Sequence, residues 1–459
     1  MVCHNTGSLT GISFPRCGFL LYSSGVTVMS LQSYRNILTH GKNRGLVFLL
    51  DRMGQYRRGG WTVSSGCDQA LALAQSNDVV ILPRMPDPGY LSWLRGLGLG
   101  TAHIVSYGGI HPGGALARTV VDYPEPVAKC LHELGLPSVL VPWYSGEAEG
   151  LAAHALGLNC FGSPAEVSQA CNDRLQFKQW CQTEDLPVLP GASVVLENRS
   201  PWVVERELEE RMVQFGDDAG RVLVRSGKGG EGFSLVFSND RGRGRELYET
   251  LSYHGIDQVL VEPLVEASAF VENQWIMGDG CANQGWVEQV RSMNWGRNTC
   301  LGSRDYFPPL KSKILRISDR IVSHMADRGY VGPMGIDYVL DRNSRLFPLG
   351  VRARFSGAAH ARLLVENLAG HIGPIHSWKS IQARVAPSDF LGLYHRLGAL
   401  IYDGKARVSV FPWGCDTLEY NGHVGLLLLA RDIKGIARLE SALEDCGVAW
   451  NKGELPRTE

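Results

Sequence analysis

The sequence carries almost no excess charge of either sign. It has 45 lysines and arginines against 46 aspartates and glutamates, which gives a formal net charge of −1. A protein whose main partner is nucleic acid needs a concentrated basic surface to bind phosphates. The balance therefore argues against nucleic acid as the main partner.

Long hydrophobic runs and closely spaced cysteine pairs are missing as well. No apolar run approaches the roughly 20 residues that a membrane-spanning helix needs, so we expect no membrane partner. The 11 cysteines include no CxxC pair, and Cys160, Cys171 and Cys181 lie about a helical stretch apart without accompanying histidines. An odd number of cysteines without a framework predicts reduced thiols in a cytoplasmic protein. Nothing in the sequence decides between a monomer and a homo-oligomer.

The first third of the chain alternates between strand-like and helix-like patterns. The continuous apolar runs of strand length are Leu46–Leu50, Val79–Leu82, His103–Ser106 and Val139–Val141. Strands that alternate with helices indicate an open α/β unit with a parallel sheet. We therefore predict such a domain over residues 46–165, preceded by a tail or edge element at residues 1–45.

The pattern changes again near residue 386, where apolar strands and a final helix-like segment follow one another. The strands are Arg407–Phe411 and Gly425–Leu429, and the helix lies near residues 436–446. We predict a separate unit over residues 166–385 and a small C-terminal α/β lobe over residues 386–459.

A glycine-rich motif of the form G-x-G-x-x-G begins at Gly227. In a dinucleotide-binding fold this motif follows a strand and opens a helix, but here residues 233–237 are strand-like. We therefore expect the tip of a hairpin, a flap whose backbone N–H groups cover phosphates, and not an oxidoreductase site. Arg225 on the preceding strand adds positive charge, and the alternative is a plain surface turn. The loop residues predicted to contact the nucleotide are Lys228, Gly229, Gly230 and Gly232.

An apolar strand with an acid at its exit is the second candidate binding feature. Residues 259–261 run directly into Glu262, and Leu264 follows two residues later. A purine ring held against such an edge can bond the backbone, while the carboxylate accepts a hydrogen bond from its exocyclic amine. A strand end with a solvated glutamate is the alternative. Glu266 and Glu272 lie near enough in the sequence to approach a ribose or to close the pocket.

The most informative stretch is a β-hairpin predicted over residues 335–357. Strict alternation along its first strand places Asp337 on one face of the sheet. A two-residue turn at residues 343–344 sets Asp337 opposite Gly350, with Arg352 one step along the same face. A register slip of one residue would invert the two faces.

Asp337 is the candidate metal ligand of this hairpin. Mg²⁺ bound to a nucleotide takes one or two protein carboxylates and completes its octahedron with phosphate oxygens and water. Arg352 and Arg354 share a face if the strand is regular, and their planar guanidinium groups suit phosphates or a substrate carboxylate. The alternative pairs one of these arginines with Asp337. His360 is explained equally well as a packed core histidine and as a site residue.

The order of these features resembles the ATP-grasp superfamily from about residue 165 to residue 370: a glycine flap, a strand ending in Glu-Pro, then a Gly-x-Asp hairpin. Residues 172–174, Asn-Asp-Arg, are similar to the Asp-Lys at the start of the grasp. Arg225 stands where the family usually has a nucleotide-contacting lysine, and residues 262–264 look like its adenine-binding hinge. The flanking units resemble those of pheganomycin-type peptide ligases.

The resemblance implies an α/β fold of the ATP-grasp kind. Residues 46–165 would form a pre-ATP-grasp domain, and residues 166–385 the nucleotide-binding domain, with its flap at about residues 190–262. Residues 386–459 would form the C-terminal extension.

One departure from the family pattern concerns the metal. Family members usually read Glu-x-Asn-x-Arg on the second hairpin strand, where this chain reads Gly-Val-Arg-Ala-Arg at residues 350–354. The Glu and Asn usually bind the magnesium ions, and Gly350 and Arg352 replace them. Asp337 is then left with a reduced ligand set for Mg²⁺, and Arg352 is expected to supply a fixed positive charge in place of one ion.

The activity implied by the resemblance is ATP-dependent carboxylate–amine ligation through an acylphosphate, on amino-acid-like small molecules, as in peptide or natural-product biosynthesis. Arg225 and Lys228 would hold phosphates, and Arg354 would steady the acylphosphate oxyanion. Glu262 and Leu264 would hold adenine. The alternative is a nucleotide-binding but catalytically weakened homologue that acts as an accessory or regulatory protein.

Overall fold

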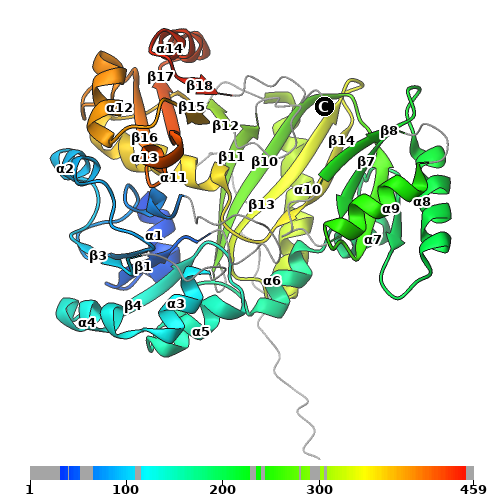
Figure 1. The fold of residues 1–459 in the computed structure, drawn as a ribbon, viewed down its shortest axis with the longest axis horizontal. Coiled ribbons are helices and arrows are strands. Elements are labelled where there is room, and N and C mark those ends of the chain that lie inside the picture. The colour runs from blue at the N-terminus through cyan, green and yellow to red at the C-terminus, as the bar shows by residue number, and fades with distance from the viewer. Residues whose placement is uncertain are drawn as a thin grey trace, which may run out of the picture.

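Figure 1 shows a parallel-sheet lobe beside a C-terminal lobe, a long central sheet next to both, and a small lobe at the far end of that sheet. The computed structural model describes residues 31–39, 41–51, 66–108, 115–227, 234–238, 243–278, 281–289, 300–303 and 308–450. Within these ranges, no helix combines the length and the apolar character needed to cross a bilayer.

The N-terminal lobe is built on a parallel sheet with strand order β3-β2-β1-β4-β5. The apolar runs recognised in the sequence form β1 to β4. Of these, β1, β2 and β4 are inner strands, which need apolar side chains on both faces because both faces are covered, and β3 lies at the edge. The predicted α/β class is confirmed. The strands are β1 (Gly45–Leu49), β2 (Val79–Leu82), β3 (His103–Ser106), β4 (Ser138–Pro142) and β5 (Asn159–Cys160). The helices are the 3₁₀ turn η2 (Cys67–Ala70), α2 (Pro88–Gly96), α3 (Leu116–Asp122), α4 (Glu125–Leu134) and α5 (Glu147–Ala155).

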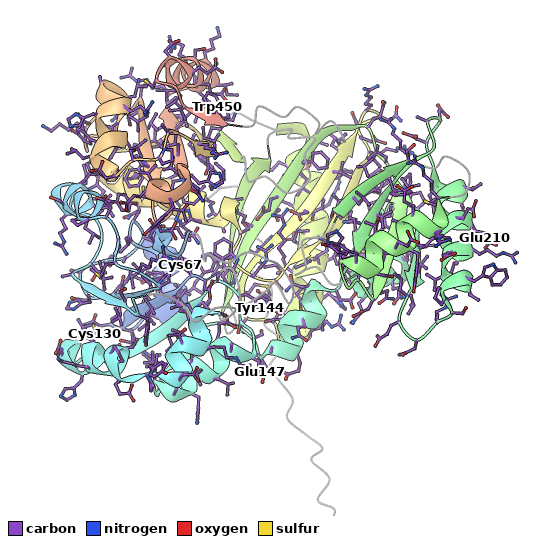
Figure 2. The ribbon with its side chains drawn as sticks, in the orientation of Figure 1. Cys67, Cys130, Tyr144, Glu147, Glu210 and Trp450 are labelled. Atoms are coloured by element: carbon purple, nitrogen blue, oxygen red, sulfur yellow. The ribbon has the colours of Figure 1, made fainter. Side chains whose placement is uncertain are left out.

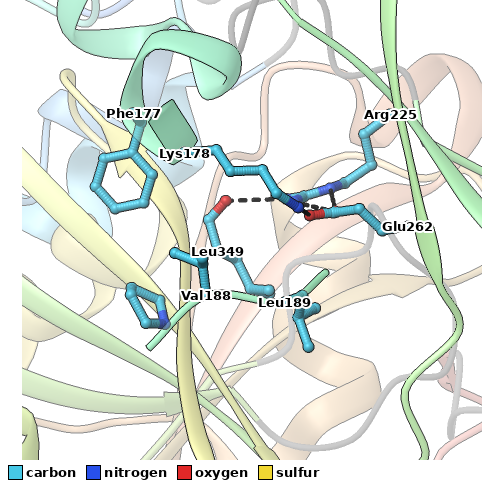
Figure 3. A pocket seen from close by; sticks show the side chains of 8 residues that line it. Phe177, Lys178, Val188, Leu189, Arg225, Glu262 and Leu349 are labelled. Atoms are coloured by element: carbon cyan, nitrogen blue, oxygen red, sulfur yellow. Dashed lines mark hydrogen bonds and ion pairs between the residues drawn. The ribbon is translucent and has the colours of Figure 1, made fainter. Parts of the chain in front are cut away.

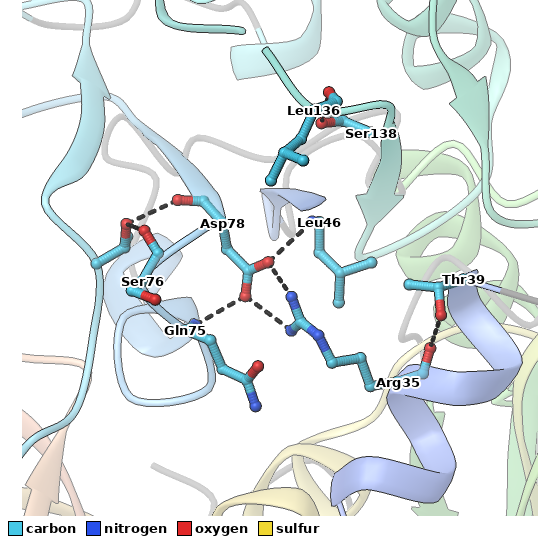
Figure 4. A network of polar contacts seen from close by, with 9 residues as sticks. Arg35, Thr39, Leu46, Gln75, Ser76, Asp78, Leu136 and Ser138 are labelled. Carbon is cyan, nitrogen blue, oxygen red and sulfur yellow. Dashed lines mark hydrogen bonds and ion pairs between the residues drawn. The ribbon is translucent and has the colours of Figure 1, made fainter. Parts of the chain in front are cut away.

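Helix α1 (Leu31–Thr39) belongs to this lobe, although the sequence indicated only a tail or edge element there. Arg35 reaches back to Asp78, with Nη1 2.8 Å from Oδ2 and the other terminal nitrogen on Oδ1 (Figure 4). The same carboxylate accepts from the backbone N–H of Leu46 at 2.9 Å and of Gln75 at 2.7 Å. A buried carboxylate needs such partners, so this network anchors α1 on the amino-terminal ends of β1 and β2.

The small lobe is an antiparallel sheet with strand order β6-β9-β7-β8. Arg225 on β7 pairs with Ser234 on β8, so the glycine loop joins two antiparallel strands, and the predicted hairpin is confirmed. The loop residues Lys228, Gly229, Gly230 and Gly232 lie outside the described residues. Helices α6 (Ala165–Asn172) and α7 (Arg174–Thr183) come before this lobe in the chain and pack in the core of the central sheet. The elements of the small lobe are β6 (Ala192–Val195), α8 (Pro201–Phe215), β7 (Arg221–Ser226), β8 (Ser234–Ser238), α9 (Gly244–Tyr253) and β9 (Gln258–Pro263).

The large sheet runs in the order β14-β13-β10-β11-β12-β15-β17-β16, with β18 beside β15. The C-terminal strands thus continue the central sheet, and they share one apolar core with the N-terminal lobe. The strands are β10 (Ala267–Gly278), β11 (Cys281–Gln289), β12 (Cys300–Ser303), β13 (Gly332–Asp341), β14 (Leu346–Arg352), β15 (Ser377–Arg384), β16 (Ser409–Trp413), β17 (His423–Ala430) and β18 (Ala449–Trp450). The helices are α10 (Pro308–Asp327), α11 (Gly357–Ile372), α12 (Phe390–Leu397), the 3₁₀ turn η3 (Gly398–Leu400), α13 (Leu418–Asn421) and α14 (Ile433–Asp445).

The hairpin of β13 and β14 places Asp337 opposite Gly350, as predicted, by a different route. The turn has three residues, 342–344, not two, and Ser344 adopts a positive φ of 60°. A bulge at Leu349 adds one unpaired residue to β14 and restores the predicted pairing at Asp337. Two departures of one residue each therefore cancel.

Because of Glu149, in the first turn of α5, we expect the stability of the parallel-sheet lobe to depend on pH. Burial, with a smaller contribution from the nearby Asp51, raises the pKa of Glu149 from 4.5 to about 7. The folded state then binds more protons than the unfolded state between these values, so stability falls as the pH rises from 4.5 to 7 and stays lowered above 7. We expect Glu149→Gln, which keeps the oxygen that accepts from Gly146, to stabilise the protein by about 2–3 kcal/mol at pH 8 and little at pH 4.5.

The measurement is the free energy of unfolding in urea at both pH values, with Glu147→Gln as the matched control. Glu147 lies in the same helical turn but is exposed. An equal effect of the two substitutions at pH 8 would show that burial of Glu149 carries no penalty.

Candidate functional site

The site lies where the amino-terminal end of α7 meets the end of β7. Asp173 caps α7: its Oδ1 accepts from two N–H groups of the first turn, at 2.8 and 3.0 Å. The helix therefore begins at Arg174, whose backbone N–H donates to the carbonyl of Gly227 at 2.8 Å. The Arg174 side chain donates from Nη1 to the carbonyl of Ser226 at 3.1 Å. The residues just before the glycine loop are thus tied to the start of α7.

A buried ion network of one carboxylate and two cations lies beside this junction (Figure 3). Lys178 Nζ lies 2.6 Å from Glu262 Oε1, and Arg225 Nε lies 2.9 Å from Glu262 Oε2. Arg225 also donates from Nη1 to the carbonyl of Leu349 at 3.1 Å, which links the small lobe to β14. The Glu262 carboxylate is therefore bound by cations, and the adenine amine predicted as its partner would have to compete with them. The small pocket around the network is lined by Phe177, Lys178, Val188, Leu189, Arg225, Glu262, Pro348 and Leu349.

Gly191 allows the backbone to pack directly against this ion network. A Cβ at this position would lie 2.7 Å from Glu262 Cγ and 2.8 Å from Lys178 Nζ, and its φ is +152°. The backbone after Pro190 can approach the ion network this closely because residue 191 has no side chain.

Lys178 and Arg174 are the site cations absent from the residues predicted above to bind nucleotide. The two lie four residues apart on α7, a spacing that puts both on one face of a helix, and this signal was available in the sequence. The pKa of Lys178 is lowered by burial, and the neighbouring Glu262 offsets part of that effect. Burial and, to a lesser degree, the neighbouring Arg225 lower the pKa of Arg174 to about 9. An anion at this place would relieve that repulsion.

A second group of charges lies on the central sheet. Glu272 on β10, Asp337 on β13 and Gly350 on β14 are directly opposite one another, so the two carboxylates share one face. Arg352 bridges them: its Nε lies 2.7 Å from Asp337 Oδ2, and its Nη1 lies 3.6 Å from Glu272 Oε2. Ser356 donates to Glu272 Oε1 at 2.5 Å. Burial raises the pKa of Asp337, Arg352 lowers it, and Glu272 raises it. The ion pair is the alternative that the sequence left open.

The residues around Asp337 do not fit the predicted magnesium ion. Gly350 offers no ligand, and Arg352 holds one Asp337 oxygen, so that only Oδ1 is left without a hydrogen-bond partner among the described residues. No group of three or more His, Cys, Asp or Glu side chains in the described part of the chain could hold a metal. Gly350 also has a φ of +155°, so a glutamate there would be strained.

Arg354 lies at the meeting point of the hairpin and the N-terminal lobe. β14 ends at Arg352, so Arg354 does not share a strand face with it. Its Nη1 donates to the carbonyl of Phe355 at 2.7 Å, and the Phe355 N–H donates to the carbonyl of Trp143, just after β4, at 3.0 Å. Figure 2 shows the next residue, Tyr144, at this junction of the two lobes. Arg354 is therefore placed at the carboxyl-terminal edge of the parallel sheet, where α/β folds bind ligands.

The remaining predicted residues lie in different surroundings. Leu264 is half-buried in the link between β9 and β10. Glu266 is exposed and pairs with Arg342 at 2.6 Å, in a surface ion pair. His360 is a core histidine: it is fully buried and its Nε2 lies 3.0 Å from the carbonyl of Gln69. The group around Glu262 and the group around Asp337 are the two that the structure assembles.

Comparison with solved structures supports the fold. The chain resembles the biotin carboxylase of Campylobacter jejuni in its β-γ-ATP complex, with a TM-score of 0.56 and 11% identity over 89% of this chain and 92% of that one. It also resembles the biotin carboxylase domain of Hydrogenobacter thermophilus 2-oxoglutarate carboxylase, with a TM-score of 0.56 and 14% identity over 90% and 92%. A third match is N5-carboxyaminoimidazole ribonucleotide synthetase from Thermus thermophilus, with a TM-score of 0.52 and 15% identity over 90% of this chain and 100% of that one.

No protein-family profile and no curated protein sequence matches the chain. At these levels of identity the structural matches speak for the fold alone. The ATP-grasp resemblance predicted from the sequence is confirmed at that level, and the finer resemblance to pheganomycin-type ligases stays a prediction. The chain has the fold of the ATP-grasp enzymes.

Proposed function

We propose that the protein binds ATP at the junction of the small lobe and the central sheet and uses it to join a carboxylate to an amine. The observation that carries this is the gathering of cations at one place: the buried Lys178 and Arg225 and the half-buried Arg174, with Arg352 across from them. Burial and mutual repulsion make these positive charges unfavourable without a ligand, so the cations attract phosphate groups. Two proteins of the same fold were solved with β-γ-ATP or with MgADP and ADP, which supports a nucleotide here.

The proposed reaction has two steps. A substrate carboxylate oxygen attacks the γ-phosphorus of ATP, the bond to the β-phosphate oxygen breaks, and ADP leaves. The amine then attacks the acylphosphate carbon, loses a proton, and expels inorganic phosphate as the amide forms. Arg225 and Lys178 would hold the phosphates, the backbone of residues 262–264 would hold adenine, and Arg354 would stabilise the oxyanion of the acyl intermediate.

The substrate class is part of the proposal. An amino-acid-like carboxylate and a small-molecule amine follow from the resemblance to peptide ligases. Tyr144 lies at the junction of the hairpin with the N-terminal lobe (Figure 2), and its half-buried ring would form part of an apolar wall for the acyl group.

Removal of the Arg354 guanidinium tests this assignment. We expect Arg354→Ala to lower amine-dependent ADP release at least 100-fold, because loss of one oxyanion donor costs about 10²–10³ in rate. The measurement is ADP release over a matrix of amino-acid carboxylates and amines. Arg345→Ala is the matched control, since Arg345 is an exposed arginine of the same hairpin that pairs with Asp341 at 2.7 Å. Equal loss in both variants would contradict the role of Arg354.

A second function is favoured by the ion pair of Arg352 and Asp337. An arginine bound to the acid where a metal would act is the arrangement expected of a homologue that binds nucleotide but has weakened catalysis. ATP binding without ADP release from any carboxylate and amine would support this accessory or regulatory role over ligation.

A further inference from the structure

We propose that Arg352 is a built-in counter-cation, so that this site takes metal-free ATP and not its magnesium complex. The inference rests on the proposed nucleotide site and specifies the ionic form of its ligand. It starts from one juxtaposition: Glu272 and Asp337 lie side by side on adjacent strands, and a guanidinium group occupies the space between them.

Two adjacent carboxylates on one sheet face would ordinarily make this a place for a divalent cation. Here both are already bound. Arg352 Nε lies 2.7 Å from Asp337, Ser356 donates to Glu272 at 2.5 Å, and Glu272 is fully buried. A magnesium ion could join these acids only by displacing the guanidinium group or by lying against it, at the cost of like-charge repulsion.

The surrounding charges favour a ligand of higher negative charge. Arg174, Lys178, Arg225 and Arg352 face the three carboxylates of Glu262, Glu272 and Asp337, which leaves one positive charge in excess before any ligand binds. Magnesium neutralises part of the charge of a triphosphate, and metal-free ATP keeps all of it. A guanidinium group is also a strong hydrogen-bond donor to phosphate oxygens.

Titration calorimetry of the wild-type protein with ATP tests the proposal without any variant. We expect ATP in EDTA to bind as tightly as ATP in saturating magnesium, or more tightly. Binding that is about tenfold tighter with magnesium, which corresponds to about 1.4 kcal/mol, would overturn the proposal and leave the proposed ligase function standing. Absence of ATP binding under both conditions would overturn the proposed function itself, and the inference with it.

Arg352→Gln reverses the expected dependence on the metal. Without its cation the variant should bind ATP in EDTA about tenfold more weakly, and magnesium should now strengthen binding, because Asp337 and Glu272 lose the guanidinium group between them. Manganese alone, followed by its electron paramagnetic resonance signal, should bind to this variant and not to the wild type. Arg345→Gln, with an ion pair of the same length on the same hairpin, should behave as the wild type does. An Arg352→Gln variant that keeps the wild-type response to EDTA and magnesium would overturn the proposal.

Discussion

Glu262→Gln is expected to lower the free energy of unfolding by about 3–5 kcal/mol, because it breaks a buried ion network at its only carboxylate. The Glu262 side chain is 3% exposed and is bound by Lys178 and by Arg225, whose side chains are 9% and 4% exposed. A neutral amide leaves both cations buried without compensation. The measurement is urea unfolding of the wild type and the variant.

A matched pair in the same lobe provides the control. Glu207 lies 2.6 Å from Arg199, but these side chains are 24% and 33% exposed. A solvent-accessible ion pair contributes about 0–1 kcal/mol, so Glu207→Gln should hardly change the free energy of unfolding. Similar losses in Glu207→Gln and Glu262→Gln would rule out a special role for burial.

A double-mutant cycle separates the network from its parts. Lys178→Met alone should cost less than Glu262→Gln, because Arg225 still compensates the carboxylate. The double variant should be less destabilised than the sum of the two single variants, because the methionine removes one of the two stranded cations. Strict additivity would indicate that Lys178 and Glu262 do not interact in solution.

Local patterns in the sequence were sufficient to predict the strands that carry the site residues. Alternation along β13 places Asp337 on the face opposite to Ile336 and Tyr338, and those two residues pack in the core beneath α10. The strand-like residues after the glycine motif likewise identified a hairpin, since a period of two is visible within a few residues. Each of these conclusions needs only neighbours in the chain.

Other features depend on partners far away in the sequence. The bulge at Leu349 and the three-residue turn cancel in the register, and no local pattern reveals either alone. The bond from Lys178 to Glu262 spans 84 residues, and the burial of α1 depends on Asp78, 43 residues after Arg35. Whether Arg352 binds Asp337 or a ligand is a choice of side-chain conformation, which sequence patterns do not decide.

Phe355→Ala is the second substitution for which we expect a large effect, a loss of about 3–5 kcal/mol in the free energy of unfolding. The Phe355 ring is 1% exposed, packs in a stacked arrangement on Trp143 with centroids 6.1 Å apart, and meets Tyr34 edge-on at 5.9 Å. Its removal leaves an apolar cavity between α1, the end of β4 and the hairpin, and the surrounding rings can relax into that space only in part.

The same residue positions the site, because Phe355 lies between Arg354 and Ser356. Ser356 caps α11, accepting from the N–H of Ala359 at 3.0 Å, and donates to Glu272. We therefore expect Phe355→Ala to lower ADP release even at temperatures where the variant is fully folded, since a small shift of Arg354 misplaces its guanidinium group. Phe355→Leu, which keeps most of the apolar volume, should retain most of the stability and of the rate. If Phe355→Ala lost stability but kept the wild-type rate, the ring would serve the core alone, and the link from the parallel-sheet lobe to Arg354 would have no part in catalysis.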